Sequence, residues 1–118
     1  MTLRFTARQT ATLTRNWDLR EDACRAGRPF DPTPVVKVFT PDAGGTWLIA
    51  AMNREGTLAY GLADLGLGFV EAGDIDLREL RALRGRLGLP VEIDRWFQPN
   101  RVLSEYQAEG RRHGRLQA

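Results

Sequence analysis

The sequence has 118 residues, enough for one hydrophobic core but not two, so we expect a single domain spanning residues 1–118. With 42% hydrophobic and 27% charged residues it has the composition of a soluble globular protein, and no apolar run approaches the roughly 18 residues that a membrane span needs. The first residues lack the apolar run of a secretory signal, and Cys24 is the only cysteine, which excludes an intramolecular disulfide and favours a bacterial-type cytoplasm.

The charge is unevenly distributed, although the formal net charge is only +2. Residues 1–31 carry six arginines against four acids, 32–77 carry two bases against six acids, and 78–118 carry nine arginines against five acids. The middle of the chain is therefore acidic and both flanks are basic, which can attract a partner of opposite charge. No segment approaches the basicity of dedicated nucleic-acid-binding domains.

The N-terminal segment, residues 1–31, predicts helix or irregular structure, because its apolar residues are sparse among threonines and arginines. Asp18 is placed to cap a short helix over Leu19–Ala26, with Glu21 completing a capping box and Gly27 ending the helix. The three prolines that follow restrict the backbone and predict an extended segment.

A series of strands follows, because the apolar pattern changes to runs rich in β-branched and aromatic residues. The predicted strands are Val35–Phe39, Thr46–Met52, Thr57–Asp64 and Phe69–Ile75. The loops between the strands are too short for crossover helices, so neighbouring strands must be antiparallel. The sequence therefore predicts a meander sheet.

The next predicted element is a helix with a clear start. Asp76 stands where an N-cap is needed, and Glu79 completes a capping box. We expect the helix to end near Gly85 or Gly88. Its apolar stripe at helical spacing consists of Leu77, Leu80, Leu83 and Leu87.

The last part of the chain predicts a short strand, Val91–Trp96, and a short helix around Glu105–Gln107. We expect the tail, residues 110–118, to be mobile because few apolar anchors offset its ordering entropy. The predicted fold is α+β: an antiparallel meander of four to five strands packed against one central amphipathic helix, with a core over about 34–106 and a helical N-terminal segment.

Several motifs in combination resemble a family catalogued as domain of unknown function 2958, over roughly Pro34–Tyr106. They are Thr40-Pro41-Asp42 with Thr46-Trp47, Gly61 to Phe69, Glu79-Leu80, Arg84-Gly85, Leu87 to Glu92, and Leu103-Ser104-Glu105. Where many members have Glu-Arg-Asp, this chain has Glu92-Ile93-Asp94. The family consists of small single-domain proteins of plasmids and integrative elements, often encoded among conjugation and antirestriction genes. The resemblance implies an accessory protein of a mobile genetic element and transfers no catalytic residues.

Reactive side chains are scarce. Catalysis by a Cys or Ser with His needs a base beside the nucleophile, but the only histidine, His113, lies in the predicted mobile tail. Cys24 has no nearby histidine and is expected to be buried as a small hydrophobic residue. A structural zinc site needs four Cys or His ligands, and the chain has two such residues. We therefore expect a protein that is not an enzyme and has no cofactor.

Acidic residues offer one alternative, a metal-dependent enzyme. If Asp42 and Asp64 met at one edge of the sheet, their oxygens could hold a magnesium ion and support an enzyme. The simpler interpretation is that Asp42 closes a turn, Asp76 caps a helix and the other acids are solvated.

Arginines offer a second alternative, nucleic-acid binding. Arg78, Arg81 and Arg84 recur every three residues along the predicted helix, and Arg101 follows. Such a stripe could contact phosphates, with Trp96 as a stacking surface. Against this, exposed helix faces are normally charged, and Trp96 is expected in the core.

Binding of another protein is the preferred function, because this small domain lacks recognisable chemistry and its three tryptophans and five phenylalanines permit an exposed aromatic anchor. The family context adds the hypothesis that the protein inhibits or modulates a host defence or replication complex, of the anti-restriction or anti-CRISPR type. The sequence does not predict the oligomeric state.

Overall fold

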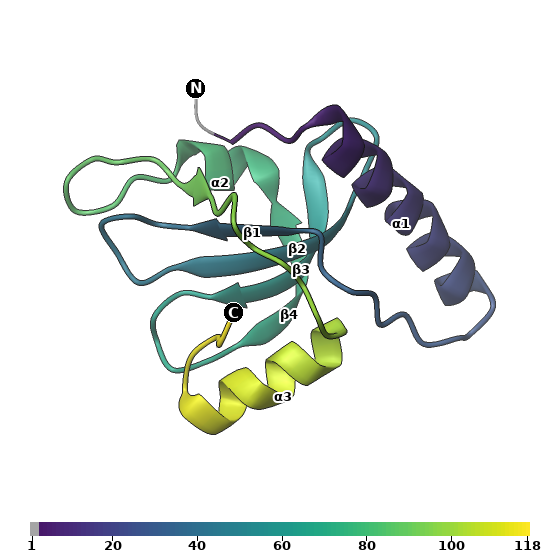
Figure 1. Ribbon diagram of the computed structural model, residues 1–118. Helices are drawn as coiled ribbons and strands as arrows, with labels where there is room; N and C mark the ends of the chain where they lie inside the picture. Colours follow the sequence, from purple (N-terminus) through teal and green to yellow (C-terminus); the bar gives the residue numbers. More distant parts are fainter. Residues whose placement is uncertain (1–2) are drawn as a thin grey trace.

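The computed structural model describes residues 3–118, which form three helices and five strands (Figure 1). In chain order these are α1 (Ala7–Arg25), β1 (Val36–Phe39), β2 (Thr46–Met52), β3 (Leu58–Asp64), β4 (Glu71–Asp76), α2 (Leu77–Ala82), β5 (Glu92–Ile93) and α3 (Leu103–His113). The strands form one sheet in the order β4-β3-β2-β1-β5, with every pairing antiparallel. This confirms the predicted α+β class and meander sheet. None of the helices within residues 3–118 is both long and apolar enough to cross a membrane.

The sheet is the middle layer between two apolar cores, because side chains of a strand alternate between its faces. On one face Trp47 and Ile49 of β2 pack with Leu13 of α1 and with Leu77 and Leu80 of α2. The other face has a smaller core made by β2, β3 and α3 with the residue before β4. Its buried members are Leu48, Ala50, Leu62, Val70, Leu103 and Tyr106.

The helix α1 lies at the end of the sheet opposite to the β1–β2 loop (Figure 1). The β2–β3 register shifts between Ile49 and Ala51, so the pairing contains a bulge at Ala50. Asn16 of α1 donates a hydrogen bond from Nδ2 to the Ala50 carbonyl at 2.9 Å. Asn16 thus provides a hydrogen-bond donor for the backbone carbonyl at the bulge, where the regular pairing of β2 with β3 is interrupted.

The N-terminal segment forms one continuous helix rather than the predicted short helix capped by Asp18. Thr6 and Gln9 make a reciprocal capping box at its start. Asp18 lies inside the helix and its carboxylate pairs with Arg54 at 2.6 Å. No glycine or proline interrupts residues 7–25, so nothing stops the helix before Gly27, which has a φ of +67° and ends it as predicted.

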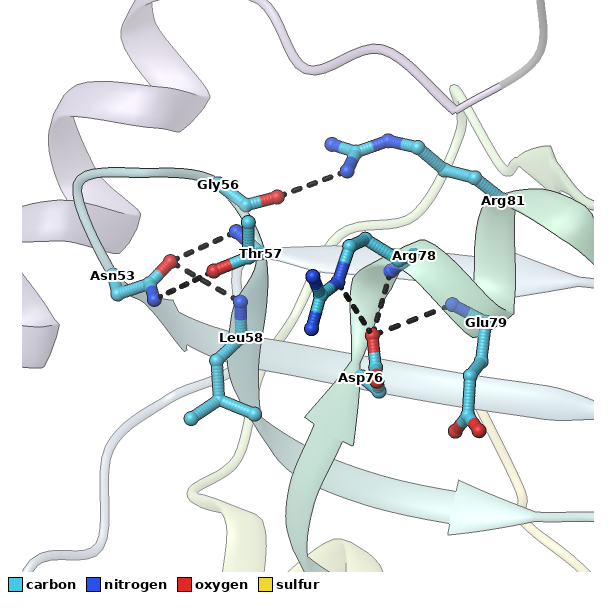
Figure 2. A network of polar contacts seen from close by, with 8 residues as sticks. All are labelled: Asn53, Gly56, Thr57, Leu58, Asp76, Arg78, Glu79 and Arg81. Atoms are coloured by element: carbon cyan, nitrogen blue, oxygen red, sulfur yellow. Dashed lines mark hydrogen bonds and ion pairs between the residues drawn. The ribbon is translucent and has the colours of Figure 1, made fainter.

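The helix α2 is shorter than predicted. The N-cap is confirmed, since Asp76 Oδ1 accepts the amides of Arg78 and Glu79 at 2.9 and 3.3 Å (Figure 2). The helix nevertheless ends at Ala82, and Leu83 is extended with a ψ of 137°. The predicted stripe therefore stops at Leu80, because Leu83 and Leu87 lie beyond the helix and are 39% and 78% exposed.

The C-terminal segment is more regular than expected from the sequence. The last helix, expected only around Glu105–Gln107, runs from Leu103 to His113 and so includes the beginning of the tail expected to be mobile. Beyond it, the Leu116 amide donates to Asp64 Oδ2 at 2.8 Å. Asp64, which anchors the tail, lies 52 residues before Leu116, so the composition of the tail alone could not predict this contact.

Candidate functional site

Three loops lie at the end of the sheet away from α1: the β1–β2, β3–β4 and α2–β5 loops (Figure 1). Asp42, in the β1–β2 loop, joins two of them. Its Oδ2 accepts the amides of Leu87 and Leu89 in the α2–β5 loop at 2.6 and 3.3 Å. Its Oδ1 is buried without a hydrogen-bond partner among the described residues. Asp42 therefore anchors the α2–β5 loop through that loop's backbone.

Asp64 has a similar structural role at the end of β3. Its side chain is only 3% exposed, and its oxygens accept the amides of Gly66 at 2.9 Å and Leu116 at 2.8 Å. Asp42 and Asp64 thus bind amides of different segments. Within residues 3–118, no group of three or more His, Cys, Asp or Glu side chains is placed to hold a metal ion.

The remaining reactive residues are also dispersed. Cys24 is exposed, so the expectation that it is buried was wrong. It lies next to Ala23, which takes the buried position on α1 and leaves the thiol facing outward. His113, at the end of α3, lies 3.2 Å from the Glu109 carboxylate.

The arginines predicted as a stripe on one helix do not form one. Arg81 donates to the carbonyl of Leu3 and to that of Gly56. The contact with Gly56 ties α2 to the β2–β3 turn (Figure 2). Arg84 lies after the helix and donates to two nearby carbonyls of its own turn. Arg78 lies 3.7 Å from the N-cap carboxylate of α2. Because α2 ends at Ala82 and each arginine makes its own local contact, the three side chains do not line up along one face of a helix.

Trp96 and Arg101, in contrast, lie together. Trp96 is 90% exposed, so its expected place in the core was wrong. The reason is that β5 ends at Ile93 and Asp94 Oδ1 accepts the Trp96 amide, which forms a turn instead of a continued strand. Trp96 and Arg101 line one hollow of about 470 Å³, where the guanidinium lies 5.8 Å from the ring centre of Tyr106.

The most distinctive feature of the three-loop end is exposed apolar surface, which the sequence analysis missed. The β3–β4 loop contains the alternation Leu65-Gly66-Leu67-Gly68-Phe69. Its three apolar side chains are exposed, Leu67 to 70%, because the loop extends beyond the sheet. Gly66 and Gly68 have φ values of +80° and +90°, a conformation that strongly favours glycine. The break between the predicted strands at Asp64 and Phe69 is thus present, but the exposure of its apolar side chains was not predicted.

These side chains form a continuous surface with the start of the α2–β5 loop. Leu65, Leu67 and Phe69 line a hollow of about 360 Å³ together with Ala63. Leu65 also borders a second hollow of about 340 Å³, whose lining includes Leu83. We call Leu65, Leu67, Phe69 and Leu83 the apolar loop surface.

Comparison with known proteins confirms the resemblance found in the sequence. No curated protein and no solved structure shows a significant similarity to the chain. A family model described as "Protein of unknown function (DUF2958)" matches residues 5–117, including α1 and α3 as well as the sheet. Because this match covers nearly the whole chain, the protein belongs to the DUF2958 family.

Proposed function

We propose that this protein is not an enzyme and acts by binding another protein through the apolar loop surface. The observation that carries the proposal is that four large apolar side chains of two loops, between 39% and 70% exposed, line two hollows that have Leu65 in common. Contiguous exposed apolar surface is uncommon on a monomer, because covering it with a partner releases water at a favourable free energy. Aromatic and aliphatic anchors of this kind dominate protein interfaces.

The chemistry of the acids also favours binding over catalysis. A general base or a metal ligand needs free carboxylate oxygens directed at one point. Asp42 and Asp64 instead accept backbone amides of two separate segments, and the one oxygen of the pair without a hydrogen bond among the described residues, Asp42 Oδ1, is buried. Asp42 thus supports the α2–β5 loop, and Asp64 supports the β3–β4 loop and the tail.

The biological setting of the proposal comes from the family. Members are typical of bacterial plasmids and integrative elements, so we propose an accessory protein of such an element that acts in the cytoplasm. Its target would be a protein complex of the host, with defence against foreign DNA or replication as the process inhibited or modulated. The exposed apolar surface supports the binding step of this proposal.

The proposal is tested by replacing Leu67 and Phe69 together with aspartate and capturing partners from a lysate of cells that carry the gene. Charges at both positions should abolish capture, since each would have to be desolvated in the complex. Leu19→Asp is the matched control, because Leu19 is 51% exposed on α1, away from the loops. We expect the wild type and Leu19→Asp to capture the same stoichiometric partner. The proposal is rejected if the double variant captures it equally well, or if the wild type captures none.

A second candidate function is binding of single-stranded nucleic acid at Trp96 and Arg101. The exposed indole and the nearby guanidinium share one hollow and could stack a base and contact a phosphate. This candidate predicts that Trp96→Ala lowers affinity for a short oligonucleotide by roughly 1–3 kcal/mol, and that affinity falls as salt rises. Fluorescence anisotropy measures both. Absence of binding by the wild type at low salt would eliminate this candidate.

A further inference from the structure

We propose, building on the proposed protein-binding function, that the free edge of β4 binds an extended segment of the partner. The segment has an apolar residue flanked by Lys or Arg and adds to the sheet as a sixth strand. The apolar residue fills the hollow between α2 and the β3–β4 loop, and the flanking cations meet the acids at its rim.

The edge of the sheet is available for such an addition. Among residues 3–118, β4 is paired with β3 alone and is the terminal strand on its side. Alternate backbone groups of an edge strand point outward, and an extended peptide can pair with them. A side-chain carbon at Gly73, in the middle of β4, would meet no atom within 4 Å, so the sheet face at the centre of this strand is uncrowded as well.

The hollow beside this edge has an apolar interior. Its volume is about 340 Å³. Its apolar lining consists of Trp47, Ala63, Leu65, Ile75, Leu80 and Leu83. Ile75 belongs to β4 itself, so a strand paired with β4 would pass directly beside the hollow. In strand addition, the paired backbone provides affinity and such a hollow selects the side chain.

The polar lining of the hollow determines the charge of the segment. It includes the three acids Asp74, Asp76 and Glu79 and no basic residue. Asp74 already pairs with Arg20, and Asp76 caps α2, but Glu79 has no ion pair among the described residues. A cation at this rim therefore gains a favourable interaction, whereas a nucleic-acid phosphate would be repelled.

The same acids disfavour a second copy of this chain as the occupant. Antiparallel pairing of two β4 strands would bring the three acids of one copy close to those of the other. These acids are Glu71, Asp74 and Asp76. Like charges on paired strands are destabilising, and charged edges are a common protection against self-association. A basic foreign segment has no such penalty.

The test uses the full chain and a synthetic peptide of about ten residues that alternates lysine with β-branched residues and has one central leucine. A peptide with glutamate at every lysine position is its counterpart. Amide hydrogen exchange of β4 should slow about tenfold with the lysine peptide and stay unchanged with the glutamate peptide. Glu79→Lys should weaken binding of the lysine peptide roughly three- to tenfold. Glu92→Lys, which makes the same charge change on the opposite edge strand β5, should not.

Three outcomes overturn the inference. The first is that the lysine peptide protects only residues 65–69, and the second is that it does not bind at all; neither affects partner capture through the apolar loop surface. The third is a dimer of the free protein in light scattering with β4 already protected, which identifies a second copy as the occupant. Loss of the proposed function is recognised separately, by equal capture with the Leu67 and Phe69 double variant.

Discussion

Replacing Gly61 with alanine is expected to destabilise the protein by about 3 kcal/mol or more, a large effect for one methyl group. Gly61 lies in the middle of β3, beside the β2 bulge. A side-chain carbon at this position would lie 1.9 Å from the carbonyl oxygen of Leu48, which no rotamer can relieve. Because the oxygen belongs to the backbone of β2 and the new carbon is bonded directly to the backbone of β3, the strands must separate to accommodate it. Urea denaturation followed by circular dichroism measures the free energy of unfolding.

Gly73→Ala is the matched control for this prediction. Gly73 is the direct partner of Gly61 in the β3–β4 ladder, and a side-chain carbon there meets nothing within 4 Å. Both changes remove the same backbone freedom, so they differ mainly in the clash. We expect Gly73→Ala to change the free energy of unfolding by less than about 1 kcal/mol. Equal destabilisation by the two variants would contradict the structure of the β2–β3 pairing.

Replacing Asp42 with alanine is expected to cost about 2–3 kcal/mol and to release the α2–β5 loop. The change leaves the amides of Leu87 and Leu89 without their carboxylate acceptor, and hydrogen bonds to charged groups contribute about 1.5–3 kcal/mol. Hydrogen exchange of these two amides should accelerate, while exchange in β2 and β3 stays slow. Unchanged exchange at Leu87 would show that Asp42 does not hold the loop.

Gly85 provides a second, more stringent test of the same contact. A side-chain carbon at Gly85 would lie 1.6 Å from Oδ1 of Asp42, so Gly85→Ala alone should displace that carboxylate and cost about 1–3 kcal/mol. In the Asp42→Ala background the obstructing oxygen is absent, and Gly85→Ala should cost little more. A double-mutant cycle therefore predicts a non-additivity of about 1 kcal/mol or more. Strict additivity would contradict the contact.

The strands were predictable because their signals are local. β2 has the predicted bounds, Thr46–Met52, and the other long strands differ from prediction by one or two residues at their ends. Turns rich in glycine, asparagine and aspartate separate them, and short connections leave antiparallel pairing as the only option. Asp76 as an N-cap and Gly27 as a helix end were predictable for the same reason, since each acts on amides or backbone angles next to it.

The end of α2 was not predictable in this way. Leu83 and Leu87 continue the helical spacing of Leu77 and Leu80, and nothing in that segment stops the pattern before Gly85. The chain instead folds back so that its amides reach Asp42, which lies 45 residues before Leu87. A charge-assisted contact of this kind outweighs the few tenths of a kcal/mol per residue by which leucine and arginine favour a helix over other residues.

The sequence by itself determined the class of the fold, the meander and the family of this protein, because periodicity, turn residues and short loops act between neighbours along the chain. Tertiary structure alone decided which side chains are available for binding. Trp96, Cys24 and the leucines of the loops are residue types typical of a core, yet all of them are exposed. Trp96 and the loop leucines lie beyond the ends of strands and helices, and Cys24 faces outward because Ala23 takes the buried position on α1. Exposure depends on which distant segments pack together. Contacts such as that between Asp64 and Leu116 join residues far apart in the sequence, so no pattern of neighbouring residues predicts them.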